Sequence, residues 1–133
     1  MAGAHRETIA ATECLMQRIE QTRASGWTVL TTATGVRDQI LNSPLGCSAP
    51  LSQLQEQITI SPYPALIPAP TPIVVVRNTN GTEQIISQPA AGFDLRSLLA
   101  VRADLQLTWQ SNLGQRQRTR QISTVIALDA LLK

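Results

Sequence analysis

The chain has few aromatic residues and little net charge, and these shortages exclude several classes of protein. Aromatic residues make up 3% of the 133 residues, so we expect an aliphatic core. The formal net charge is only +2, which is too weak a field to indicate a nucleic-acid-binding protein. No apolar run approaches the roughly 20 residues of a membrane-spanning helix, and the first residues show no signal-peptide pattern. The length predicts a single domain, residues 1–133.

The residues that usually carry catalysis are equally scarce. The single histidine, His5, lies in a start that has no recognisable pattern, and the nine acidic residues are scattered. Serines such as Ser43, Ser48 and Ser97 have no partner base nearby in the sequence, and no glycine-rich phosphate loop is present. We therefore predict a protein that is not an enzyme and that has no catalytic residues, cofactor-binding residues or metal ligands.

The two cysteines leave several interpretations open. Cys14 and Cys47 are either a disulfide pair, two unrelated thiols or half of a metal site. A metal site is disfavoured because there is no second pair of ligands of the kind that zinc requires. A disulfide would close a loop of roughly 34 residues and stabilise the fold by about 3 kcal/mol in the chain-entropy model.

The N-terminal part of the chain predicts a long helix over residues 6–25. Ile9, Met16 and Ile19 belong to a series of residues spaced by three and four, which predicts an apolar stripe that faces the core. Gly26 is well placed to end the helix. We expect Trp27 to fill the space at its end, and a second, shorter helix over residues 31–42.

From residue 57 the hydrophobic period changes to two, which predicts an antiparallel sheet over residues 57–128. Four prolines between residues 64 and 72 indicate an extended surface connector, and Asn80-Gly81 indicates a hairpin turn. Residues 93–100 are either a short helix capped by Asp94 or an irregular approach to the next strand. The final hairpin runs from Val101 to Leu128.

Three arginines alternate along the last strand of this hairpin: Arg116, Arg118 and Arg120. Because alternate residues of a strand share a face, they would form one basic patch. The patch would either contact an acidic partner, a DNA backbone or an anionic surface, or keep the edge of the sheet from pairing with other chains. Trp109 would lie across from the arginines if the register allows.

Two stretches of the chain resemble the type IV pilin-like family, which includes minor pilins and the pseudopilins of type II secretion. Residues 10–27 are similar to the lower part of the first helix of a pilin, around Ile19-Glu20 and Arg23-Ala-Ser-Gly-Trp27. Residues 105–109 and 118–127 are similar to the last hairpin of the family. The middle of the chain has no match, and the leader, processing site and apolar first half of the helix that mark the family are absent.

The resemblance implies an α+β fold in which a long N-terminal helix packs on one face of a roughly four-stranded antiparallel sheet. It also implies a non-enzymatic subunit that assembles with other pilin-like subunits into a type IV pilus or secretion fibre. Such subunits act in adhesion, protein secretion or DNA uptake. An upstream apolar segment would anchor the full-length protein in the bacterial inner membrane, with this domain in the periplasm or at the cell surface. An oxidising compartment favours the Cys14–Cys47 disulfide.

The alternative is a stand-alone α+β module that binds a partner, such as a phage or secretion accessory protein. A small hydrolase is a third and weaker interpretation, because His5 would be its only histidine.

Overall fold

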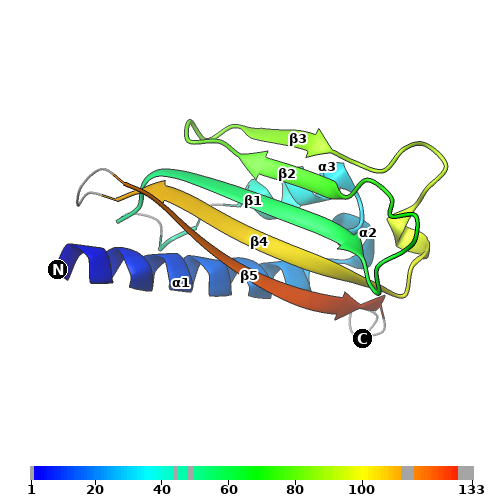
Figure 1. The fold of residues 1–133 in the computed structure, drawn as a ribbon, viewed down its shortest axis with the longest axis horizontal. Coiled ribbons are helices and arrows are strands. Elements are labelled where there is room, and N and C mark those ends of the chain that lie inside the picture. Colours follow the sequence, from blue (N-terminus) through cyan, green and yellow to red (C-terminus); the bar gives the residue numbers. More distant parts are fainter. Residues whose placement is uncertain (1, 44, 48–49, 112–115, 129–133) are drawn as a thin grey trace.

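The molecule is a two-layer α+β structure in which the helices cover one face of a five-stranded antiparallel sheet (Figure 1). The computed structural model describes residues 2–43, 45–47, 50–111 and 116–128, and of residues 2–5 it describes the backbone alone. The helices are α1 (Ala2–Ala24), α2 (Trp27–Leu30), α3 (Ala33–Gly35), a π-helix η1 (Val36–Leu41) and a 3-10 helix η2 (Leu95–Ser97). The strands are β1 (Ser52–Pro62), β2 (Ile73–Arg77), β3 (Glu83–Ser87), β4 (Ala100–Gln110) and β5 (Gln117–Ala127).

The predicted number of strands was wrong: the sheet has five strands and not roughly four, in the order β3-β2-β1-β4-β5. The central strand is β1, which pairs antiparallel with β2 on one side and with β4 on the other. The proline-rich segment that follows β1 reverses the chain, so that β2 returns directly beside it. Every strand segment after residue 51 therefore joins the same sheet.

The period of two places the aliphatic side chains of the strands on the helix side. Ile58 and Ile60 of β1 lie opposite Leu105 and Ala103 of β4, and all four are buried. The other face of the sheet carries mainly amide and hydroxyl side chains, for example the cross-strand row Gln57, Gln106 and Gln121. The core is thus a single aliphatic layer between sheet and helices, as the low aromatic content predicts.

The segment between α1 and β1 differs from the predicted helix over residues 31–42. It is broken into α2, α3 and the π-helix η1. Thr32 caps α3, since its hydroxyl accepts a hydrogen bond from the backbone N–H of Gly35. Gly35 is required at its position because a Cβ there would collide with the backbone of Val29. This close packing lets the short helices cover the β2 end of the core.

Two local predictions concern the loops. The Asn80-Gly81 pair forms the β2–β3 turn, and Gly81 has a φ of 87° that suits glycine. Between β3 and β4, the sequence allowed either a short helix capped by Asp94 or an irregular segment, and the structure has the 3-10 helix η2. The Asp94 side chain accepts a hydrogen bond from the backbone N–H of Arg96. The indole of Trp27 donates to the carbonyl oxygen of Arg96 at 3.0 Å, which ties this loop to the end of α1.

Candidate assembly surface

Helix α1 has one face buried against the sheet and one face directed to solvent. The predicted core stripe was wrong in two of its three members: Ile19 is 4% exposed, but Ile9 is 45% and Met16 is 48% exposed. At 100° per residue, Ile9 and Met16 lie on the side opposite the buried centre of the helix. The buried face consists of small, aliphatic and polar residues: Glu7, Ala10, Ala11, Cys14, Leu15, Arg18, Ile19 and Thr22.

The outer face of α1 is defined by Ile9, Glu13, Met16 and Glu20. These residues are spaced by four, three and four, so they share one stripe, and all of them are exposed. Glu13 and Glu20 have no ion-pair partner among the residues that the structure describes. One stripe of the helix thus presents two large apolar side chains and two carboxylates to solvent.

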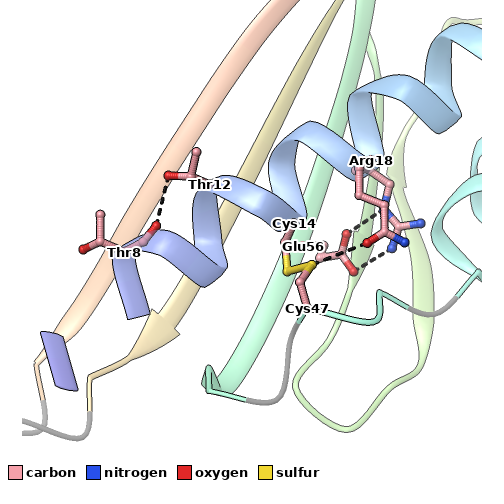
Figure 2. Close-up of a disulfide and its surroundings, with 7 residues drawn as sticks. Thr8, Thr12, Cys14, Arg18, Cys47 and Glu56 are labelled. Atoms are coloured by element: carbon pink, nitrogen blue, oxygen red, sulfur yellow. Dashed lines mark hydrogen bonds and ion pairs between the residues drawn. A yellow bond between two sulfur atoms is a disulfide. The ribbon is translucent and has the colours of Figure 1, made fainter. Parts of the chain in front are cut away.

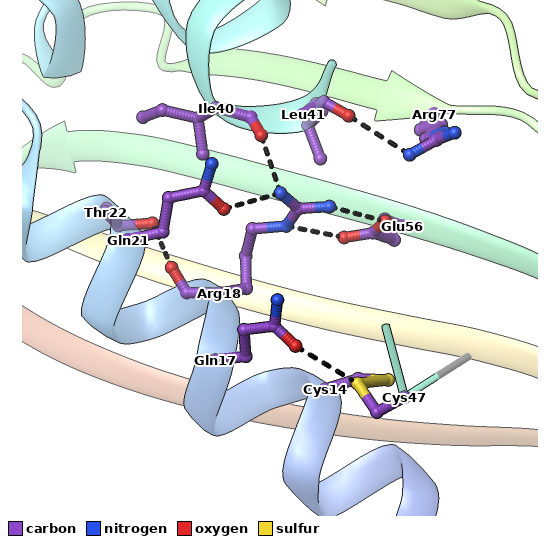
Figure 3. A network of polar contacts seen from close by, with 10 residues as sticks. All are labelled: Cys14, Gln17, Arg18, Gln21, Thr22, Ile40, Leu41, Cys47, Glu56 and Arg77. Atoms are coloured by element: carbon purple, nitrogen blue, oxygen red, sulfur yellow. Dashed lines mark hydrogen bonds and ion pairs between the residues drawn. A yellow bond between two sulfur atoms is a disulfide. The ribbon is translucent and has the colours of Figure 1, made fainter. Parts of the chain in front are cut away.

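The buried face of α1 is fixed to the sheet by Arg18, a residue that the sequence analysis did not single out. Its guanidinium is 1% exposed and forms a two-pronged pair with Glu56 of β1, with Nε–Oε2 at 2.9 Å and Nη2–Oε1 at 2.8 Å. Nη1 also donates to the carbonyl oxygen of Ile40 at 2.6 Å and to Gln21 at 2.7 Å (Figure 3). Burial of this pair is tolerable because both charged groups are hydrogen-bonded.

A disulfide joins the same helix face to the loop before β1. Cys14 and Cys47 are bonded in the structure, with their Cα atoms 5.6 Å apart. Cys14 lies one turn before Arg18, so the disulfide and the ion pair are neighbours on the helix (Figure 2). Both attach the middle of α1 to the rest of the fold. Together they fix which face of the helix looks inward, and therefore which face remains available to a partner.

The arginine row, Arg116, Arg118 and Arg120, lies at the edge of the sheet beside α1. Arg118 is paired in register with Trp109, and Arg120 with Leu107, so both side chains belong to the helix side of β5. All three arginines are exposed, and none forms an ion pair with a described residue. The hairpin tip at residues 112–115 lies outside the described residues.

Contacts at both ends of β5 show that the arginine row borders α1. Arg118 lines a small cavity of about 60 Å³ together with Trp109 and with Glu7 and Thr8 of the helix. Near the other end of β5, Arg23 donates to the hydroxyl of Thr124 at 2.7 Å. Strand β5 therefore runs alongside α1 (Figure 1), and Arg118 lies on the flank of the helix beside Thr8.

The Trp109 indole is buried at the same place. Its Nε1 is the one buried side-chain nitrogen or oxygen without a hydrogen-bond partner in the described parts of the chain. The register that the sequence left open thus places the indole beside the arginine row, but as part of the core and not as an exposed ligand platform.

A second exposed apolar region lies at the opposite end of the sheet, in the proline-rich loop between β1 and β2. Ile67 is 98% exposed, and Tyr63 and Leu66 are also exposed. A cavity of about 330 Å³ opens between this loop and Arg102 of β4. Its walls are formed mainly by apolar side chains of the loop.

Other candidate sites receive no support from the structure. In the described residues there is no cluster of three or more His, Cys, Asp or Glu side chains that could hold a metal ion. The side chain of His5 lies outside the described part. None of the described helices is long and apolar enough to cross a membrane. Comparisons with protein-family models, curated proteins and solved structures return no match.

Proposed function

We propose that the chain is a non-enzymatic structural subunit, of the minor pilin or pseudopilin kind, that assembles with other subunits through α1. The observation that carries the proposal is the outer face of α1, where Ile9 and Met16 are about half exposed on a helix whose other face is firmly fixed. Two large apolar side chains on one stripe of the solvent side offer apolar area that a second subunit could cover.

In this function the sheet domain is the outer body of the subunit and α1 is the assembly element. An apolar segment upstream of α1 would anchor the full-length protein in the bacterial inner membrane before assembly. The domain would then act in the periplasm, or at the cell surface once the fibre has formed. The disulfide agrees with an oxidising compartment of this kind.

Site-specific cross-linking in the source cell tests the proposal. A photoreactive residue placed at Ile9 or Met16 of the full gene product should give cross-links to other subunits of a fibre. The same residue at Gln121, on the far face of the sheet, is the matched control and should give few. The absence of cross-links to any subunit from positions 9 and 16 would reject assembly through α1.

A second candidate is a stand-alone module that binds a partner protein through its proline-rich loop. The exposed side chains of Tyr63, Leu66 and Ile67 favour this function. A photoreactive residue at Ile67 distinguishes the two candidates. Cross-links to one unrelated partner from position 67, without cross-links from positions 9 and 16, would favour the binding module.

A further inference from the structure

Unpaired charges of opposite sign lie on two neighbouring elements of the molecule, α1 and β5. Glu13 and Glu20 are exposed on the outer face of α1, and Arg118 and Arg120 are exposed on the neighbouring strand β5. No ion pair among the described residues involves any of these four side chains. Some other exposed charges are paired locally, as in Arg37–Asp38 and Arg96–Asp94.

The geometry of α1 explains why the four charges do not pair within one chain. The face of the helix that meets the sheet is held there by Arg18 and Cys14, which directs Glu13 and Glu20 away from the sheet. Arg118 instead lies beside Thr8, on the flank of the helix. The two sets are therefore fixed on different surfaces of the molecule, and each surface is open to a neighbouring molecule.

We propose that the arginine row of one copy binds Glu13 and Glu20 on the outer face of α1 of a second copy. This inference rests on the proposed function, and it names the partner surface. The occupant is a second copy because the chain itself carries both halves of the complementary surface. Ile9 and Met16, which alternate with the two glutamates, would be covered in the same contact.

When the outer α1 face and the arginine row of one copy meet two different neighbours, the contact is heterologous. A heterologous contact that does not close into a ring continues from copy to copy and produces a filament. Each subunit would offer its outer α1 face to one neighbour and its arginine row to the next. A second copy of the chain is thus the partner both for these charges and in the proposed fibre.

Charge reversal provides the test, with self-association of the purified chain measured by sedimentation equilibrium at low ionic strength. Glu13→Arg/Glu20→Arg and Arg118→Glu/Arg120→Glu should each weaken self-association by roughly tenfold or more. An equimolar mixture of the two variants should associate about as well as the unaltered chain. A chain that carries all four substitutions has the original net charge and should also associate. Circular dichroism and thermal unfolding of each variant establish that the fold is intact.

Each other outcome rejects the inference. If the unaltered chain does not associate, or if neither reversal weakens association, the arginine row is not a subunit contact. If both reversals weaken association but the mixture does not restore it, the two surfaces do not meet. If only the arginine reversal has an effect, the row binds some other acidic group. Cross-links from positions 9 and 16 that persist in any of these cases would leave the proposed function standing without this contact.

Discussion

The two faces of α1 are opposite in character although they belong to the same 23-residue helix. The inner face holds a disulfide, a buried arginine and the aliphatic side chains of Leu15 and Ile19. The outer face holds exposed apolar residues and unpaired glutamates. The inner face therefore supplies stability, and the outer face is free to change without loss of the fold. Substitutions on the two faces should separate stability from assembly.

The largest effect is expected when the buried pair of the inner face is broken. Arg18→Met removes the guanidinium and leaves the Glu56 carboxylate buried without its partner, which should cost about 3–5 kcal/mol of unfolding free energy. Replacing both residues, as in Arg18→Met/Glu56→Leu, should recover much of this loss because no buried charge remains. Urea unfolding followed by circular dichroism measures both.

The exposed pair Arg37–Asp38 provides the control for that experiment. Arg37→Met removes a guanidinium from an ion pair of similar geometry at the surface, and no measurable loss is expected. An equal loss in Arg37→Met and Arg18→Met would show that burial is not what makes the Arg18 pair important.

A matched pair of isoleucines compares the two faces directly. Ile19→Ala empties a buried position and should cost about 2–5 kcal/mol. Ile9→Ala removes a side chain that is 45% exposed and should change stability by less than about 0.5 kcal/mol, because alanine also favours the helix. The same urea titrations give both values. Similar losses in the two variants would contradict the assignment of the faces.

The periodicities explain which parts of the fold could be predicted from the sequence. The period of two in residues 101–109 predicted the face of β4 correctly, since Ala103, Leu105, Leu107 and Trp109 are all buried. A strand offers only two faces, so one alternating run decides between them. The β4–β5 hairpin and the turn at Asn80-Gly81 follow in the same way from local residue types.

The same reasoning could not decide which face of α1 is buried. Two stripes compete on this helix, and each contains two large apolar side chains: Ile9 and Met16 on one, and Leu15 and Ile19 on the other. The true inner stripe contains alanines and Arg18, which becomes buried only because Glu56, the Ile40 carbonyl oxygen and Gln21 surround it. Those partners come mostly from distant parts of the chain. A signal was present in the cysteine at position 14, because its link to Cys47 requires that side to face the body of the protein.

Loss of the disulfide should have an intermediate effect on the inner face. Reduction, or the double variant Cys14→Ala/Cys47→Ala, removes the constraint on the unfolded chain and should cost about 2–4 kcal/mol. Urea unfolding with and without reductant measures the loss, and the mass under denaturing conditions should rise by two hydrogens on reduction. The double variant should be insensitive to reductant. An unchanged mass after reduction would show that the bond does not form.

The smallest effect is expected at a surface ion pair, where the charges are satisfied but not buried. Hydrogen bonds from the Arg96 guanidinium, and then from the Arg96 backbone N–H, hold the pKa of the Asp94 carboxyl below its ordinary value of 3.8. A carboxyl whose pKa is lowered by folding adds stability above its unfolded pKa and loses it as pH falls through the folded pKa. The contribution of Asp94 should therefore be present above about pH 4 and fade in more acidic solution.

Asp94→Asn isolates this contribution, because asparagine can still cap η2 but carries no charge. Other carboxyls titrate in both proteins, so the informative quantity is the difference in unfolding free energy between the unaltered chain and the variant. That difference should be small near neutral pH and should shrink further below about pH 4. A difference that stays constant across this range would mean that the charge of Asp94 adds nothing to the fold. A surface ion pair such as Arg96–Asp94 would then contribute nothing to the free energy of unfolding, in contrast to the contribution expected of the buried Arg18–Glu56 pair.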